Sequence, residues 1–101
     1  MPSPRIRIAD GVVAGPGAPL ILIAGPDVIE SEAHALRMAG ALKGIASARG
    51  LALVYKSSFD KANRTSSSSF RGPGLAEGVA VLARVKREIG LLVTTDFHAL
   101  E

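Results

Sequence analysis

Residues 20–55 decide the fold, and they read LILIAGPDVIESEAHALRMAGALKGIASARGLALVY. Aliphatic runs over 20–24 and 51–55 stand at the two ends, and such runs are typical of strands buried on both faces of a parallel sheet. Between them a helix is expected to begin at Ser31, a good N-cap residue, and to end near Gly50. The stretch therefore predicts a β-α-β unit with parallel strands.

The expected helix has an acidic first turn, an apolar stripe and two internal glycines. Glu32 lies where the helix dipole favours negative charge. The apolar residues that recur at helical spacing are Leu36, Ala39, Leu42 and Ile45. Gly40 and Gly44 would each weaken an isolated helix by up to about 1 kcal/mol relative to alanine. We interpret them as allowing close packing against a sheet.

A second unit follows the first along the chain. Its helix is indicated by apolar residues on one face, and Gly90 ends it. Those residues are Leu75, Val79, Leu82, Val85 and Ile89. The aliphatic run 91–95 then predicts a third parallel strand. Upstream, Asp10-Gly11 between two β-prone runs predicts a hairpin with a type I′ turn over residues 5–14.

The order of these elements predicts an α/β fold. A (β/α)8 TIM barrel needs about 250 residues, and this chain of 101 residues supplies three strands and two helices of that design. We expect residues 1–101 to form a partial TIM-barrel domain that is truncated at the C-terminus. In it, the hairpin takes residues 5–14, and the three strands and two helices lie within 20–98. A small open sheet that must oligomerise is the alternative.

Composition narrows the class of protein. The chain is 48% hydrophobic but only 4% aromatic, and it has no cysteine, which rules out disulfides and zinc-thiolate sites. No apolar stretch approaches the roughly 20 residues that span a bilayer, so we expect a cytoplasmic protein without membrane contact. The net charge is +3. Because the cations form no block and stacking aromatics are scarce, no nucleic-acid partner is expected.

Polar residues follow all three expected strands, over 25–31, 56–66 and 96–98. Working residues of α/β folds lie at this carboxyl edge of the sheet. The second of these segments combines cations with hydroxyl and amide groups, namely Lys56, Lys61, Arg64, Ser58, Asn63 and Thr65. Such a set suits a phosphate or carboxylate ligand. An ordinary solvated loop is the alternative.

The second segment also carries a resemblance to a known family. KSSFDKANRTS at 56–66 and SFRGPG at 69–74 resemble the loop motif of the 3-deoxy-D-manno-octulosonate 8-phosphate (Kdo8P) synthases. AGP at 24–26, IES at 29–31 and TDFH at 95–98 are similar to the family's other strand ends, so that the match runs from residue 20 to residue 98.

The resemblance implies a (β/α)8 barrel whose N-terminal hairpin closes the bottom, assembled as a homotetramer when full length. It implies a transferase of lipopolysaccharide biosynthesis. That enzyme joins phosphoenolpyruvate, D-arabinose 5-phosphate and water to give 3-deoxy-D-manno-octulosonate 8-phosphate and phosphate.

The resemblance also implies roles for single residues. Lys56, Ser58 and Lys61 would hold phosphoenolpyruvate, Asn63 the sugar, and Arg64 and Thr65 the sugar phosphate. The catalytic candidates are Lys61, Asp96, which would face the sugar or the reacting water, and His98, as a general acid or base. For His98 a structural role, with the imidazole bonded to backbone, is the alternative.

Asp27 departs from the family pattern. One branch of the family has a metal-ligating cysteine at this position, and the metal-independent branch has asparagine. Aspartate offers oxygen to a hard or borderline divalent cation, so Asp27 is a candidate metal ligand and a divalent metal ion a candidate cofactor. Alternatively, Asp27 adds negative charge beside phosphoenolpyruvate.

Two other functions stay open at this point. One is an inactive barrel fragment that only binds phosphorylated ligands, and the other is an enzyme like the DAHP synthases. We expect the 101-residue polypeptide alone to be inactive, because further family residues lie beyond Glu101.

Overall fold

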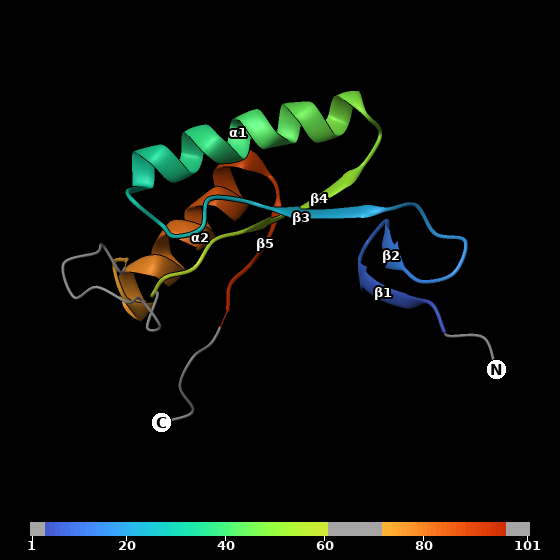
Figure 1. Cartoon of the computed structure of the whole chain (residues 1–101), viewed down its shortest axis with the longest axis horizontal. Coiled ribbons are helices and arrows are strands. Elements are labelled where there is room, and N and C mark those ends of the chain that lie inside the picture. Colours follow the sequence, from blue (N-terminus) through green and yellow to red (C-terminus); the bar gives the residue numbers. More distant parts are fainter. Residues whose placement is uncertain (1–3, 61–71, 97–101) are drawn as a thin grey trace.

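The computed structural model describes residues 4–60 and 72–96, and it has the predicted order of a hairpin followed by β-α-β-α-β (Figure 1). The elements are β1 (Ile6–Ala9), β2 (Val12–Ala14), β3 (Ile21–Ala24), α1 (Glu32–Ala48), β4 (Ala52–Lys56), α2 (Leu75–Ile89) and β5 (Leu92–Thr94). The α/β class and the antiparallel hairpin are thus confirmed. The repeated parallel units are consistent with the N-terminal part of a (β/α)8 barrel.

The three later strands form one parallel sheet in the order β3-β4-β5. Ile21 pairs with Ala52 and Ala24 with Tyr55, so the carboxyl ends of β3 and β4 lie nearly level. The end of β5 is level with them too, because Lys56 pairs with Thr94. This register brings the three strand ends to one edge of the sheet.

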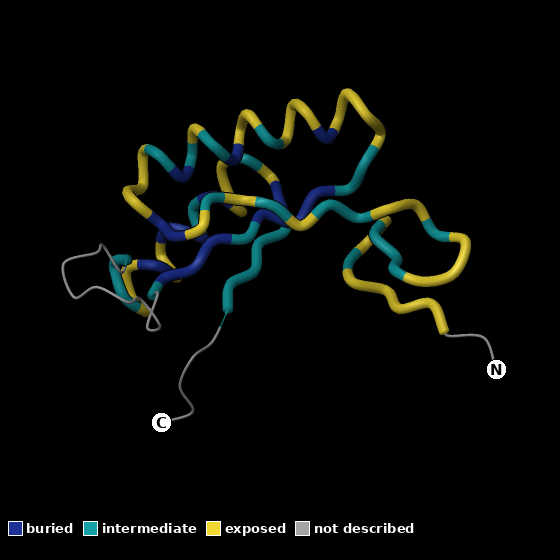
Figure 2. Tube along the Cα trace, viewed as in Figure 1, coloured by how far each residue is buried: buried dark blue, intermediate teal, exposed yellow. Residues whose placement is uncertain are grey.

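The hydrophobic core lies between the sheet and the two helices (Figure 2). Leu53 and Tyr55 of β4 face the helices, and Tyr55 is completely buried. Val85 of α2 and Ala39 of α1 are completely buried on the helix side. One core shared by both helices fixes α2 beside α1 on the sheet.

Burial of the strands differs from the prediction for β3. Val54, Leu53 and Tyr55 are all buried, so that β4 is covered on both faces as expected. In β3, Ile23 is 59% exposed, and Leu20 just before the strand is 74% exposed. The prediction that this strand is buried on both faces is wrong for the part of the chain that the structure describes, because the helices cover only one face of it.

Helix α1 begins where the sequence places it. The Ser31 backbone is extended (φ −162°), and its hydroxyl accepts a hydrogen bond from the backbone N–H of His34 at 3.0 Å. This bond satisfies one of the N–H groups that the first turn leaves without a partner. The helix ends at Ala48, and Gly50 follows with φ +66°.

The buried face of α1 is narrower than predicted and is built from small residues. Ala35, Ala39 and Ala46 are buried, whereas Ile45 is 50% exposed. The interpretation of Gly40 and Gly44 as close-packing residues is wrong. A Cβ at either position would have no neighbour within 4 Å.

Helix α2 buries Gly78, Val81, Leu82 and Val85. The predicted apolar face is therefore rotated, since Leu75 and Val79 are 55% and 50% exposed. Gly90 ends the helix in the left-handed conformation (φ +78°), and its N–H donates to the Lys86 carbonyl at 3.1 Å.

Two polar contacts join the helices. The Arg84 guanidinium of α2 donates to the carboxylate of Glu32 in α1, and within α2 it also donates to Glu88. Lys43 Nζ of α1 donates to the carbonyl of Ile89 in α2 at 2.6 Å. Both contacts are exposed, and we attribute most of the helix pairing to the core instead.

The N-terminal hairpin lies at the opposite end of the sheet from the level strand ends (Figure 1). A cavity of about 420 Å³ separates its turn from the starts of β4 and β5, and it is lined by Ala9, Asp10, Val12, Ala52, Leu53, Lys86, Gly90, Leu91 and Leu92. The turn is not type I′, because Gly11 has φ +76° but Asp10 does not have positive φ. A register shift between Arg7 and Ala9 accommodates the different turn.

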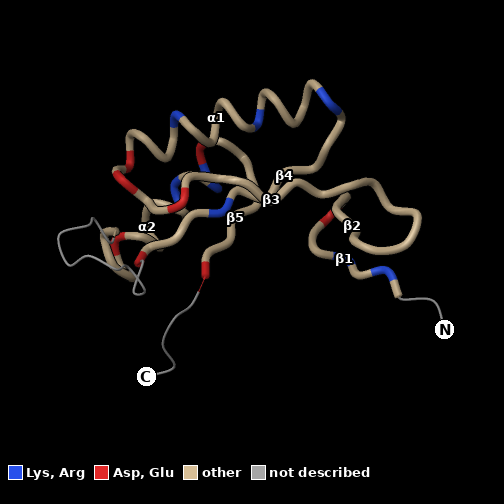
Figure 3. Tube along the Cα trace, viewed as in Figure 1, with Lys and Arg blue, Asp and Glu red and all other residues tan. Residues whose placement is uncertain are grey.

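Neither of the two described helices is long and apolar enough to cross a bilayer. Lys and Arg residues are spread over the hairpin, the sheet and both helices rather than collected on one face of the described chain (Figure 3).

Candidate active site at the carboxyl ends of the strands

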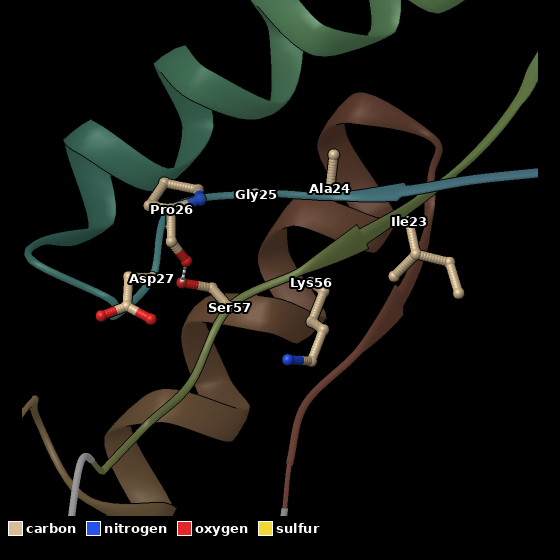
Figure 4. A pocket seen from close by; sticks show the side chains of 7 residues that line it. All are labelled: Ile23, Ala24, Gly25, Pro26, Asp27, Lys56 and Ser57. Carbon is tan, nitrogen blue, oxygen red and sulfur yellow. Dashed lines mark hydrogen bonds between the residues drawn. The ribbon is translucent and has the colours of Figure 1, made fainter.

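A cavity of about 210 Å³ opens at the carboxyl ends of β3 and β4 (Figure 4). Its lining comes from the last residues of these strands and the turns after them: Ile23, Ala24, Gly25, Pro26, Asp27, Lys56 and Ser57. Most of these residues belong to the segments that the sequence marks as candidate sites. The cavity thus lies at the edge where parallel α/β sheets bind ligands.

Hydrogen bonds from side chains join the three strand ends. The Ser57 hydroxyl donates to the Pro26 carbonyl at 2.8 Å, which links the ends of β4 and β3. The Thr95 hydroxyl donates to the Ser57 carbonyl at 2.8 Å, which links β5 to β4. The edge is therefore held together before any ligand binds. Sequence reasoning missed Ser57 and Thr95, because only the strand register shows that their hydroxyls meet carbonyls of a neighbouring strand.

Backbone hydrogen bonds extend this pairing past the end of the sheet. The Ser58 N–H donates to the Asp27 carbonyl at 3.3 Å, and the Ile29 N–H donates to the Ser58 carbonyl at 2.9 Å. Val28 and Ser58 form an isolated parallel bridge. The turn that carries Asp27 therefore runs alongside the segment that carries Ser58 and is hydrogen-bonded to it.

Ser58 has a hydroxyl that is buried without a partner among the described residues. The residue is 1% exposed, like Ser57, whose hydroxyl is bonded. A buried hydroxyl without a hydrogen bond is unfavourable by about 1–3 kcal/mol. Ser58 is not among the residues that line the cavity, so its predicted role as a donor to a ligand stays a prediction.

Charged side chains of opposite sign stand at the two sides of the cavity. Figure 4 shows the Lys56 ammonium on one side and the Asp27 carboxylate on the other, with the Ser57–Pro26 hydrogen bond between them. Lys56 is partly buried and Asp27 is exposed. The cavity can therefore offer a cation to an anionic ligand, and the role of Lys56 in holding phosphoenolpyruvate stays a prediction.

Of the remaining predicted site residues, only Asp96 lies within the part of the chain that the structure describes. Asp96 is partly buried just after β5, at the same edge of the sheet. Lys61, Asn63, Arg64, Thr65 and His98 lie outside the described residues.

The described residues do not assemble a metal site. Asp27 offers carboxylate oxygens at the cavity, but no group of three or more histidine, aspartate or glutamate side chains that could hold a metal ion occurs among residues 4–60 and 72–96. If Asp27 binds a divalent cation, the remaining ligands would come from water, from substrate or from residues outside these ranges.

Comparison with known proteins places this arrangement in a family. The model of the DAHP synthetase I family matches residues 4–101. The chain is 56% identical over 96 residues to a 2-dehydro-3-deoxyphosphooctonate aldolase of Magnetococcus marinus, covering 95% of this chain and 33% of the relative. It is 61% identical over 80 residues to the 2-dehydro-3-deoxyphosphooctonate aldolase 2 of Arabidopsis thaliana, covering 79% and 28%.

A third relative, from Methylococcus capsulatus, bears the same aldolase name and is 58% identical over 88 residues, covering 87% of this chain and 31% of the relative. The chain spans about a third of the length of these curated relatives. The aldolase name is a synonym of Kdo8P synthase, the family whose loop motif the sequence resembles. The chain therefore belongs to the DAHP synthetase I family, within which it matches the N-terminal portion of the Kdo8P synthases.

Proposed function

We propose that the protein carrying this chain condenses phosphoenolpyruvate with D-arabinose 5-phosphate and water, giving 3-deoxy-D-manno-octulosonate 8-phosphate and phosphate. The observation that carries the proposal is the cavity at the strand ends, which is lined by Lys56, the last residue of β4. Two residues further along the chain, the buried hydroxyl of Ser58 has no hydrogen-bond partner among the described residues. An ammonium and a hydroxyl two residues apart along the chain suit a small, multiply charged anion such as phosphoenolpyruvate.

In this reaction C3 of phosphoenolpyruvate forms a bond to the aldehyde carbon of the sugar phosphate. The aldehyde oxygen takes a proton, water adds at C2, and the C2–oxygen bond to phosphate breaks. Two anions that repel each other must be held in contact. The protein therefore supplies chiefly positioning and charge stabilisation.

The described residues supply the phosphoenolpyruvate half of this arrangement. Lys56 neutralises the carboxylate end of phosphoenolpyruvate, and the Ser58 hydroxyl donates to the same anion. Ser57 and Thr95 hold the strand ends level, so that both groups keep their positions before the substrate arrives. This preorganisation lowers the entropic barrier to reaction.

The other half of the site is proposed from the family resemblance. Lys61 joins Lys56 on phosphoenolpyruvate, Asn63 binds the sugar, and Arg64 and Thr65 hold its phosphate. Asp96 and His98 are then the groups placed for proton transfer to the aldehyde oxygen and from the attacking water. A cytoplasmic homotetramer in lipopolysaccharide biosynthesis belongs to the same proposal.

The test is turnover by the protein expressed from its complete natural reading frame. Phosphate release is followed with phosphoenolpyruvate and either arabinose 5-phosphate or erythrose 4-phosphate. Preference for erythrose 4-phosphate would point to a DAHP-synthase-like activity instead. Binding of phosphoenolpyruvate without phosphate release from either mixture would point to an inactive binding protein.

Asp27 gives the proposal a separate metal test. If its carboxylate ligates a divalent cation, chelation removes activity, and Mn²⁺ or Mg²⁺ restores it in the natural protein but much less in the Asp27→Ala variant. Full activity after complete metal removal would exclude Asp27 as an essential ligand. The condensation itself does not depend on this outcome.

A further inference from the structure

Three glycines from separate parts of the chain press against the segment that leaves β4, residues 56–59. A Cβ on Gly25 would lie 1.9 Å from the Lys56 carbonyl oxygen, and one on Gly72 would lie 2.4 Å from the Phe59 carbonyl oxygen. A Cβ on Gly78 would lie 2.4 Å from the Cβ of Phe59. Real Cβ atoms do not approach other atoms so closely, so a side chain at any of the three would displace the segment.

Gly78 differs from the other two because it lies in regular helix. It is buried within the second turn of α2, it has no positive φ, and its N–H makes a helical hydrogen bond to the Gly74 carbonyl at 2.9 Å. Alanine would fit its backbone and would raise helix propensity by about 1 kcal/mol. The backbone conformation does not require glycine at position 78. The close contact with Phe59 does require it, because a Cβ would not fit there.

Phe59 links Gly78 to the candidate site through the backbone of Ser58. Phe59 is buried in the core, and its carbonyl accepts a hydrogen bond from the Gly74 N–H at 3.0 Å. The preceding residue is Ser58, whose backbone bonds to Asp27 and Ile29 on the neighbouring turn. Because the contact involves Phe59 Cβ, the aromatic ring cannot rotate to relieve it. A displacement of Phe59 therefore moves Ser58 and loosens the turn that carries Asp27.

We propose that Gly78 is a positioning residue for the site: its missing side chain lets α2 seat Phe59, and thereby sets the position of Ser58. The effect of Gly78 on local structure follows from the packing alone. Its effect on ligand binding rests on the proposed function, because there Ser58 contacts phosphoenolpyruvate.

The experiment compares Gly78→Ala with Gly40→Ala in the protein expressed from its complete natural reading frame. Gly40 is an exposed helical glycine with open space around it, so it controls for the propensity effect. Amide hydrogen exchange reports local opening at the N–H groups of Ile29 and Gly74, which bond to the Ser58 and Phe59 carbonyls. Calorimetric titration with phosphoenolpyruvate reports binding.

We expect Gly78→Ala to lower protection of the Ile29 and Gly74 amides at least about tenfold more than that of amides in the middle of β4. We expect it to weaken phosphoenolpyruvate binding by up to about tenfold, the loss expected when the hydrogen bond from the Ser58 hydroxyl is not made. Gly40→Ala should change neither. Unchanged local protection in Gly78→Ala, or an equal loss at all amides, would overturn the proposal.

A second variant decides the question if Gly78→Ala does not fold. Phe59→Leu shortens the ring but keeps the Cβ that contacts Gly78, so the proposal requires Ile29 and Gly74 to keep their protection relative to β4. Selective loss in Phe59→Leu would assign the positioning to the ring and reject the proposal. If the natural protein does not bind phosphoenolpyruvate, the proposed function fails, while the exchange results still decide the role of Gly78.

Discussion

Ser57 and Ser58 are equally buried at the end of β4, but their hydroxyls differ in what they contact. The Ser57 hydroxyl bonds to the Pro26 carbonyl, and the Ser58 hydroxyl is buried without a partner among the described residues. Removal of the first loses a hydrogen bond that joins two strands. Removal of the second relieves an unfavourable buried polar group. The two alanine variants should therefore affect stability in opposite directions.

We predict that Ser57→Ala lowers the free energy of unfolding by about 1 kcal/mol, whereas Ser58→Ala leaves it unchanged or raises it slightly. In the protein expressed from its natural reading frame, Ser58→Ala should still weaken phosphoenolpyruvate binding by about five- to tenfold, the worth of one hydrogen bond. Urea unfolding and calorimetric titration measure the two effects. A Ser58→Ala variant that is less stable than Ser57→Ala would contradict the assignment.

Lys56 provides the positive charge at the cavity. We predict that Lys56→Met lowers kcat/KM for phosphoenolpyruvate by about 10- to 100-fold, because a hydrogen bond to a charged group is worth about 1.5–3 kcal/mol. Lys86→Met, at the cavity near the hairpin, is the matched control and should have no effect. Equal losses in both variants would mean that net charge, rather than a contact at the strand end, is responsible.

The ionisation of Tyr55 makes the free energy of unfolding depend on pH. Burial raises the pKa of its phenol above the ordinary value of about 10, because the charged form is poorly solvated in the core. The folded protein therefore keeps this proton at pH values where the unfolded chain has lost it. The free energy of unfolding must then fall as the pH rises through and beyond the ordinary pKa, and the contribution is fully present below it.

The comparison that isolates this effect uses Tyr55→Phe, in the polypeptide of these 101 residues, where Tyr55 is the only tyrosine. From about pH 8 to about pH 11 the stability of the natural sequence should fall relative to the variant. Ultraviolet absorbance of the tyrosinate should show ionisation coupled to unfolding. A phenol that titrates at its ordinary pKa in the folded state would show that the core around Tyr55 is open to water.

At the residue scale, the sequence predicted the groups that follow the strands but not those that hold the strands together. Lys56, Ser58 and Asp27 stand where the pattern of strand ends places them. The bonds of Ser57 and Thr95 depend on which carbonyl of the adjacent strand lies opposite, which is set by the register of the folded sheet.

Among the elements, the two helices carry glycines with opposite consequences. Gly40 in α1 is exposed with open space around it, while Gly78 in α2 meets Phe59. We predict that Gly40→Ala raises the free energy of unfolding by about 0.5–1 kcal/mol through helix propensity. Thermal or urea unfolding checks this. Destabilisation by Gly40→Ala would mean that α1 packs more closely at Gly40 than its surroundings indicate.

The helix ends were predictable and the buried helix faces were not. Ser31 and Gly90 act through local backbone geometry, and a local signal suffices to find them. Exposure of Ile45, Leu75 and Val79 depends on the angle at which each helix meets the sheet. Both helices bury small residues, such as Ala39 in α1 and Gly78 in α2, and the apolar periodicity of the sequence does not single out these positions.

For the whole molecule, the sequence predicted the order of elements and the edge that carries the site. It failed on the exposed face of β3, where Ile23 stands free of the helices. In a (β/α)8 barrel this face of the sheet points to the barrel interior, which is packed with side chains from other strands. The chain spans about a third of the length of its relatives. The aliphatic pattern of β3 is thus that of a strand buried on both faces, although one face of β3 is exposed in this structure.

The most direct measurement of the central claim is phosphate release by the protein expressed from its complete natural reading frame, with each substrate omitted in turn. The account predicts release only when phosphoenolpyruvate and arabinose 5-phosphate are both present, with one phosphate formed for each eight-carbon product detected by NMR. Erythrose 4-phosphate should be used at least about tenfold less efficiently. Phosphate release without arabinose 5-phosphate, or no release from the complete mixture, would contradict the account.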